Sequence, residues 1–213
     1  VLERVRRELA HFQETEHFDS ALRLRLATAF QELGRYRESA LILEEMLADG
    51  ASDPLGECAA HALVQCWMEE GHWSRAVAAA DRYESIFGSE GPSLSSVLLL
   101  KAEALRELSD YGAAQLTYGS LVDRFPESPL TPTALFLQGF LYLLQDDIEG
   151  ALYQFELVRR RHPDAAVAEE ADYWTGMALS FAARHEEALA HFESYPQRWP
   201  RARFRKEAHF RQA

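Results

Sequence analysis

The chain has 213 residues, of which 47% are hydrophobic, enough for one or two ordinary domains or for one array of repeats. Its formal net charge of −12 disfavours binding to the phosphate backbone of nucleic acids. Long stretches rich in Ala, Leu, Glu and Arg favour helices, and no stretch reaches the ~18–20 apolar residues of a membrane-spanning helix.

An amphipathic helix is predicted at the start of the chain, over residues 1–15. Its apolar residues share one face: Val1, Leu2, Val5, Leu9 and Phe12. It occupies the place of the second helix of an earlier repeat. At the other end, residues 206–213 match the start of a further first helix. We therefore expect this sequence to be a piece of a longer array.

Between these ends, the sequence predicts five helix pairs with a period of about 37 residues. The repeats are expected at 20–53, 57–90, 95–128, 132–165 and 169–202. The residue at the turn within each pair falls in one column: Gly34, Gly71, Ser109, Asp146 and Ala183. Gly, Ser and Asp suit a tight and left-handed backbone, which is why this column is assigned to the turns.

Residue size alternates in register on both helices of each pair. Small residues recur on the first helix at Ala27, Val64, Ala102, Gly139 and Gly176. Large residues follow three positions later at Phe30, Trp67, Leu105, Tyr142 and Leu179. The second helix has its own small column at Ser39, Ala76, Ala114, Ala151 and Ala188. Spacings of three and four residues keep these columns on one helical face, so the helices are predicted to pack closely.

The sequence gives no sign of a catalytic, metal or cofactor site. Its eight histidines form no His-Glu-x-x-His motif, and its two cysteines form no Cys-x-x-Cys motif. His185 and His191 are expected at the surface or in a turn. Cys58 and Cys66 are expected to be buried thiols, about 12 Å apart on one helix and thus too distant for a disulfide. Phosphate-binding loops and nucleophile elbows are missing as well.

Four segments carry a resemblance to a known family: Leu-Gly-Arg-Tyr at 33–36, Glu-Gly-His-Trp at 70–73, Ser-Asp-Tyr-Gly-Ala-Ala at 109–114 and His-Glu-Glu-Ala-Leu-Ala-His-Phe at 185–192. In register, they resemble tetratricopeptide repeats (TPRs). The resemblance implies an all-α, right-handed superhelical solenoid of antiparallel helix pairs. It also implies a non-catalytic scaffold that binds other proteins. The usual TPR period is about 34 residues, so longer turns between the repeats are expected here.

Three further segments resemble a bacterial envelope subgroup of TPR proteins: 123–129, 161–164 and 171–176. This subgroup includes the Tol-associated periplasmic protein and the TPR lipoprotein of the barrel-assembly machine. The resemblance implies a periplasmic or envelope-associated protein that works in an envelope assembly.

In a TPR array the first helices line the concave groove, which places an apolar stripe there. Phe136, Phe140 and Leu144 follow one another at intervals of four on one helix. Tyr173, Met177 and Phe181 repeat the pattern on the next first helix. The expected partner-binding residues are these six, together with Leu143 and Phe210.

Several interpretations of this stripe stay open. The side chains can simply pack against each other, or they can form a trough for a partner helix or an extended peptide. The trough is favoured because residues 134–144 are apolar on nearly every side, and packing inside the stack needs only one face. The missing repeats or a second copy of the chain are alternative occupants. A self-association module and a regulatory segment of a larger enzyme are the alternative functions.

Overall fold

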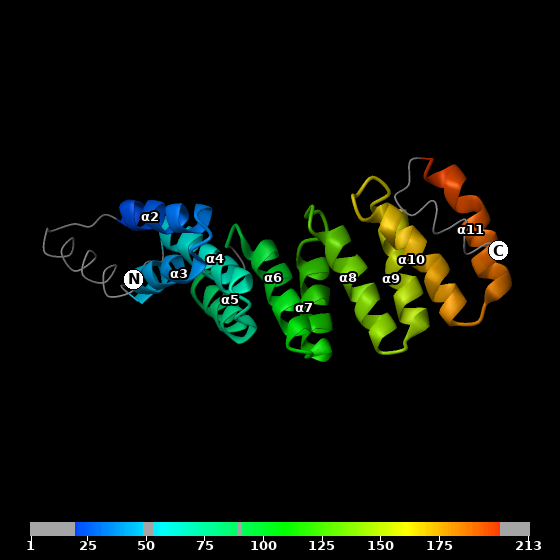
Figure 1. Cartoon of the computed structure of the whole chain (residues 1–213), viewed down its shortest axis with the longest axis horizontal. Helices are drawn as coiled ribbons and strands as arrows, with labels where there is room; N and C mark the ends of the chain where they lie inside the picture. The colour runs from blue at the N-terminus through cyan, green and yellow to red at the C-terminus, as the bar shows by residue number, and fades with distance from the viewer. Residues whose placement is uncertain (1–19, 49–52, 89–90, 201–213) are drawn as a thin grey trace, which may run out of the picture. The chain divides into compact units, whose positions relative to one another are not determined.

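The computed structural model describes residues 20–48, 53–88 and 91–200. In this part of the chain there are ten α-helices and no strands (Figure 1). The chain divides into two compact units, Val1–Ala114 and Gln115–Ala213, and each is described by itself. None of the described helices is long and apolar enough to cross a membrane. The expected helices at 1–15 and 206–213 and the predicted groove residue Phe210 lie outside the described residues.

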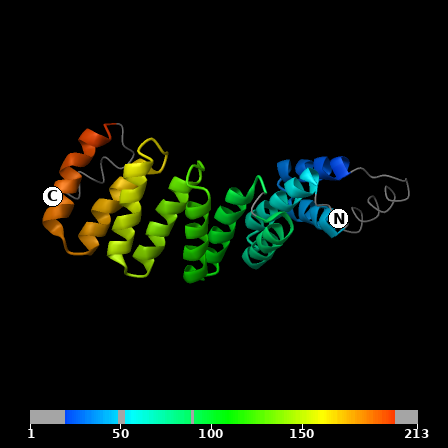
Figure 2. The same cartoon turned by 180° about the vertical axis from the view of Figure 1, so that it is seen from behind.

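The first unit consists of consecutive helices that pack on their neighbours (Figures 1 and 2). These are α2 (Ser20–Glu32), α3 (Tyr36–Ala48), α4 (Pro54–Glu69), α5 (Trp73–Phe87) and α6 (Leu94–Glu107). The next helix, α7 (Tyr111–Arg124), begins in the first unit and ends in the second.

The second unit, taken by itself, contains α8 (Thr131–Leu144), α9 (Ile148–Arg161), α10 (Ala168–Phe181) and α11 (His185–Arg198). Here too each helix packs on the next, and α8 also contacts α10. The predicted all-α fold of helix pairs is therefore confirmed. Several first helices begin slightly before the expected start of their repeat, the largest difference being at Pro54.

The turn column is confirmed by the backbone. All five residues have a positive φ, including three that are not glycine: Ser109 at 62°, Asp146 at 61° and Ala183 at 56°. In each turn the following N–H bonds back to the carbonyl of the large-residue column, as Arg184 does to Leu179 at 3.0 Å. This hydrogen bond is typical of a left-handed helix C-terminus, and it explains why the same turn recurs five times.

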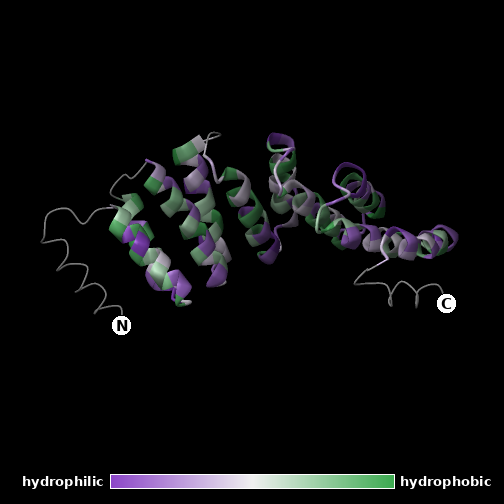
Figure 3. Ribbon diagram, turned by 90° about the horizontal axis from the view of Figure 1, so that it is seen from above, coloured by the Kyte–Doolittle hydropathy of each residue, from purple (hydrophilic) through white to green (hydrophobic). Residues whose placement is uncertain are grey.

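The columns of small and large residues form the core. The second-helix residues Leu43, Ala80, Tyr118, Phe155 and Phe192 are all buried. Two first-helix glycines make room for rings of the second helix: a Cβ on Gly139 would lie 2.6 Å from Phe155, and one on Gly176 would lie 2.5 Å from Phe192. Each helix accordingly has both hydrophobic and hydrophilic residues along its length (Figure 3).

The expectation for the two cysteines is half right. Cys66 is buried, but Cys58 is exposed. Eight residues turn a helix by about 80° beyond two full turns, so the two side chains do not share a face of α4.

Candidate functional site

The structure places three of the predicted groove residues inside the second unit. Phe136, Tyr173 and Met177 are all less than 10% exposed. The Phe136 ring lies 5.8 Å from that of Phe155, and the Tyr173 ring lies 5.9 Å from that of Phe192. These residues follow the alternative in which the stripe packs against the stack itself.

Phe140 and Leu143 are half-buried and lie between the core and the surface. The Phe140 ring contacts Phe136 at 5.3 Å on its own helix and Trp174 at 4.4 Å on α10, both in edge-on arrangements. Such aromatic pairs add to the stability that burial provides. Trp174, which the sequence analysis did not single out, thereby joins α8 to α10.

Leu144 and Phe181 are the predicted groove residues that remain exposed, at 60% and 59%. Each is the last residue of its helix, and they are 37 residues apart, so they hold equivalent positions on α8 and α10. Leu144 follows Phe140 by one helical turn, and Phe181 follows Trp174 by two. We call these four residues, Phe140, Leu144, Trp174 and Phe181, the α8–α10 surface.

Acidic residues follow this surface in the chain at both turns. Asp146 and Asp147 come directly after α8, and Glu186 and Glu187 lie in the first turn of α11; all four are exposed. Arg184 bridges Glu187 at 2.6 Å and Glu149 at 3.0 Å, and this hydrogen bonding lowers the pKa of Glu187. Both exposed apolar helix ends are therefore followed in the chain by exposed acidic residues.

A buried polar cluster joins α10 to α11 and was missed by the sequence analysis. The Asp172 carboxylate is fully buried and accepts hydrogen bonds from Arg198 Nε and Trp199 Nε1, both at 2.8 Å. His191 Nε2 lies 3.3 Å from its other oxygen. The expectation that His191 lies at the surface is wrong, because its ring turns inward to this cluster. The repeat register could have indicated this residue, because Asp172 occupies the position at which the preceding repeat has the apolar Leu135.

The Asp172 cluster is a clamp rather than a binding site. Burial acts to raise the pKa of Asp172, but hydrogen bonds from His191 and Arg198 outweigh it, so the pKa is lowered and the group stays ionised. The groups that face the Asp172 carboxylate are side chains of this same chain. Among the described residues, no group of three or more His, Cys, Asp or Glu side chains is placed to hold a metal ion.

The sequence of residues 99–166 matches the tetratricopeptide repeat family. No curated protein matches the chain by sequence. Among solved structures, a tetratricopeptide repeat protein from Parabacteroides merdae is similar with a TM-score of 0.70 and 17% identity, over 90% of this chain and 73% of that one.

Two further solved structures are similar to nearly their full length. MamA from Desulfovibrio magneticus RS-1 gives a TM-score of 0.69 at 16% identity, over 85% of this chain and 95% of that one. YrrB, described as a TPR protein with an unusual peptide-binding site, gives 0.68 at 14% identity, over 95% and 97%. These structures, together with the helix pairs described above, show that the chain has the all-α TPR fold.

Proposed function

We propose that this chain is a non-catalytic protein-interaction scaffold, and that it binds an apolar segment of another protein on the α8–α10 surface. The observation that carries the proposal is the exposure of Leu144 and Phe181 at equivalent ends of two first helices. Covering a large apolar side chain stabilises a complex by about 1.5–3 kcal/mol. Phe140 and Trp174, whose rings pack edge-on 4.4 Å apart, add half-buried aromatic surface on the same two helices.

The turns that follow α8 and α10 indicate the chemistry of the partner. Asp146, Asp147 and Glu186 are exposed, and they repel acidic segments and attract basic ones. Glu187 is already paired with Arg184. The partner segment is therefore expected to carry apolar residues flanked by Lys or Arg. Peptide binding by this fold has a parallel in YrrB, whose description names a peptide-binding site.

Site-directed photo-crosslinking tests this proposal in the source cells. A photoreactive phenylalanine derivative replaces Phe181 in the full-length protein, and irradiation is expected to give a discrete adduct with a different protein. Leu116 on α7 is 78% exposed and serves as the matched position, where that adduct is not expected. The substitution Leu144→Asp is expected to remove the adduct from Phe181.

The outcomes separate the alternatives. An adduct between two copies of this chain would establish self-association instead of partner binding. The same adduct from Phe181 and Leu116, or none from Phe181, would overturn the proposed surface.

We also propose that the scaffold works in a bacterial envelope assembly, as a periplasmic or envelope-associated protein. The support is the likeness of segments 123–129, 161–164 and 171–176 to the envelope subgroup. Fractionation of the source cells tests it: the protein is expected with the periplasm or the membranes. Recovery in the cytosolic fraction alone would contradict it.

A further inference from the structure

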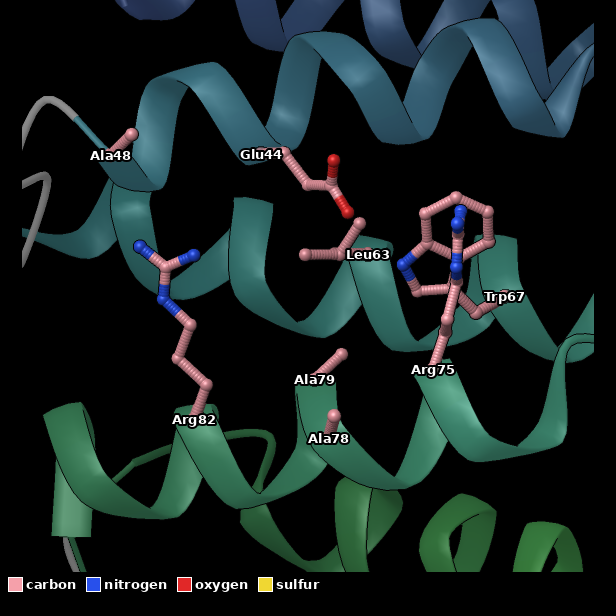
Figure 4. A pocket seen from close by; sticks show the side chains of 8 residues that line it. All are labelled: Glu44, Ala48, Leu63, Trp67, Arg75, Ala78, Ala79 and Arg82. Atoms are coloured by element: carbon pink, nitrogen blue, oxygen red, sulfur yellow. The ribbon is translucent and has the colours of Figure 1, made fainter.

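A pocket of about 570 Å³ lies in the first unit, among α3, α4 and α5 (Figure 4). Its apolar lining comes from Leu63 and Trp67 on α4 and from three alanines. Its charged lining is Glu44 on α3 and Arg75 and Arg82 on α5, whose side chains surround the opening in the close-up view. The volume falls in the range of about 300–1,000 Å³ that is usual for ligand sites.

The repeat explains why a pocket forms at this place. Leu63 corresponds to Lys101, which in the next repeat bridges Asp81 at 2.6 Å and Glu84 at 2.9 Å. The uncharged Leu63 thus leaves open a groove that these ion pairs occupy one repeat later. Ala78 at the opening is short, whereas the corresponding residues of the next two repeats, Leu116 and Tyr153, are large and mostly exposed.

The guanidinium of Arg75 lies over an aromatic ring. Its guanidinium carbon is 4.7 Å from the centre of the Trp67 ring. A guanidinium over a ring is attracted to the ring face, and its N–H donors can still serve other partners. Among the described residues its side chain has no hydrogen bond or ion pair. Its edge can therefore receive a carboxylate with two parallel hydrogen bonds.

Arg82 provides a second cation on the same face of α5. It donates one hydrogen bond to the carbonyl of Leu47 at 2.7 Å, and a guanidinium has five N–H donors. The two arginines are seven residues apart, or about 10.5 Å along the helix. Later repeats have no such pair: the positions of Arg75 are taken by Ala113, Gly150 and Glu187.

We propose that this pocket binds an acidic peptide segment of a partner protein. Two carboxylates of the segment pair with Arg75 and Arg82, and an apolar side chain between them lies on Leu63 and the alanines. Glu44 on the opposite wall accepts a backbone N–H of the segment. The charge argument is specific, because the chain as a whole carries −12 whereas the pocket has two cations against one anion. In a polyproline II segment, side chains three residues apart share one face and lie about 9 Å apart, which is close to the spacing of the arginines.

Calorimetric titration of the full chain tests this proposal. The probe is a peptide blocked at both ends, with two Glu residues three positions apart and a Leu between them. Arg75→Gln and Arg82→Gln are each expected to weaken binding about tenfold or more, since each removes a charge-assisted hydrogen bond. Ala78→Tyr is expected to weaken binding, because it places a large side chain at the opening of the pocket between Arg75 and Arg82.

The controls are matched to these variants. Arg25→Gln on α2 removes the same charge from an exposed position and is expected to leave binding unchanged. The same peptide with Gln in place of Glu is not expected to bind. Added salt is expected to weaken the binding of the acidic peptide, because it screens the charges. Circular dichroism checks that each variant keeps its helices.

Three results would overturn the proposal: no binding of the acidic peptide, equal binding of the Gln peptide, or unchanged binding in both Arg75→Gln and Ala78→Tyr. Free glutarate that binds as tightly as the peptide would show a small dicarboxylate site instead. Phe181→Asp is expected to leave this titration unchanged. The titration therefore tests the pocket independently of the α8–α10 surface.

Discussion

At the scale of single residues, the turns show how far the sequence alone was informative. The column that contains Gly34 and Gly71 also contains Ser109, Asp146 and Ala183, and register alone assigned all five to left-handed turns. Cys58, His191 and Asp172 were harder, because their burial depends on which helix lies opposite. A spacing pattern predicts the face of a helix and does not give the partner of an individual polar atom.

The turns predict opposite effects for opposite substitutions. Ala183→Gly is expected to raise the free energy of unfolding by up to about 1 kcal/mol, because the left-handed backbone strains a residue with a Cβ. Gly34→Ala is expected to lower it by about 1 kcal/mol for the same reason. A Cβ on Gly34 has nothing within 4 Å, so no clash contributes. Urea unfolding of both variants measures the two changes in the free energy of unfolding. Changes of the same sign would contradict a role for left-handed backbone strain.

The Asp172 clamp predicts a dependence on pH. Asp172→Asn is expected to lower the free energy of unfolding by about 2–3 kcal/mol at neutral pH, because it leaves the partly buried Arg198 and His191 without their buried anion. The pKa of Asp172 is lowered by folding, so its contribution is complete above the usual carboxyl pKa and is lost as the pH falls through the folded-state value. The difference between the two proteins should therefore shrink below about pH 4.

Urea unfolding at several pH values measures this difference. Asp164→Asn at an exposed position is the control and should leave stability nearly unchanged throughout. A difference for Asp172→Asn that stays constant down to pH 2 would contradict the assignment.

At the scale of helices, the pairs and their contact faces followed from the columns, but the depth of each side chain did not. Phe136 and Phe140 lie one turn apart on α8, yet Phe136 is buried and Phe140 is half-buried, because Phe155 and Trp174 cover them unequally. The groove stripe was therefore a correct set of helical positions whose inner members belong to the core. What remains for a partner is the outer end of the stripe.

The close helix contact at Gly176 gives the prediction at this scale. Gly176→Ala is expected to lower the free energy of unfolding by about 1–3 kcal/mol, because its Cβ would overlap the buried Phe192 ring. Gly112→Ala on α7 makes the same change where nothing lies within 4 Å, and helix propensity is expected to stabilise it by up to about 1 kcal/mol. Thermal unfolding of both variants compares them. Equal shifts in Tm would argue against a packing role for Gly176.

At the scale of the whole molecule, the chain has the TPR fold, and its helix pairs differ in what they expose. One repeat opens a pocket with two arginines, and the later first helices end in Leu144 and Phe181 beside acidic turns. The sequence placed Leu144 and Phe181 in its apolar stripe, and their role in binding a partner stays a prediction. It did not predict the pocket, because the lining residues come from three helices that only the fold brings together.

The most direct test of the central claim is the affinity of the crosslinked partner's segment for variants of the α8–α10 surface. Calorimetry compares the unchanged chain with Phe181→Asp and with Leu116→Asp, which places the same charge at another exposed apolar position. Phe181→Asp is expected to weaken binding about tenfold or more, as the loss of one buried aromatic side chain implies, and Leu116→Asp should leave it unchanged. Equal affinity for all three proteins would contradict partner binding on the α8–α10 surface.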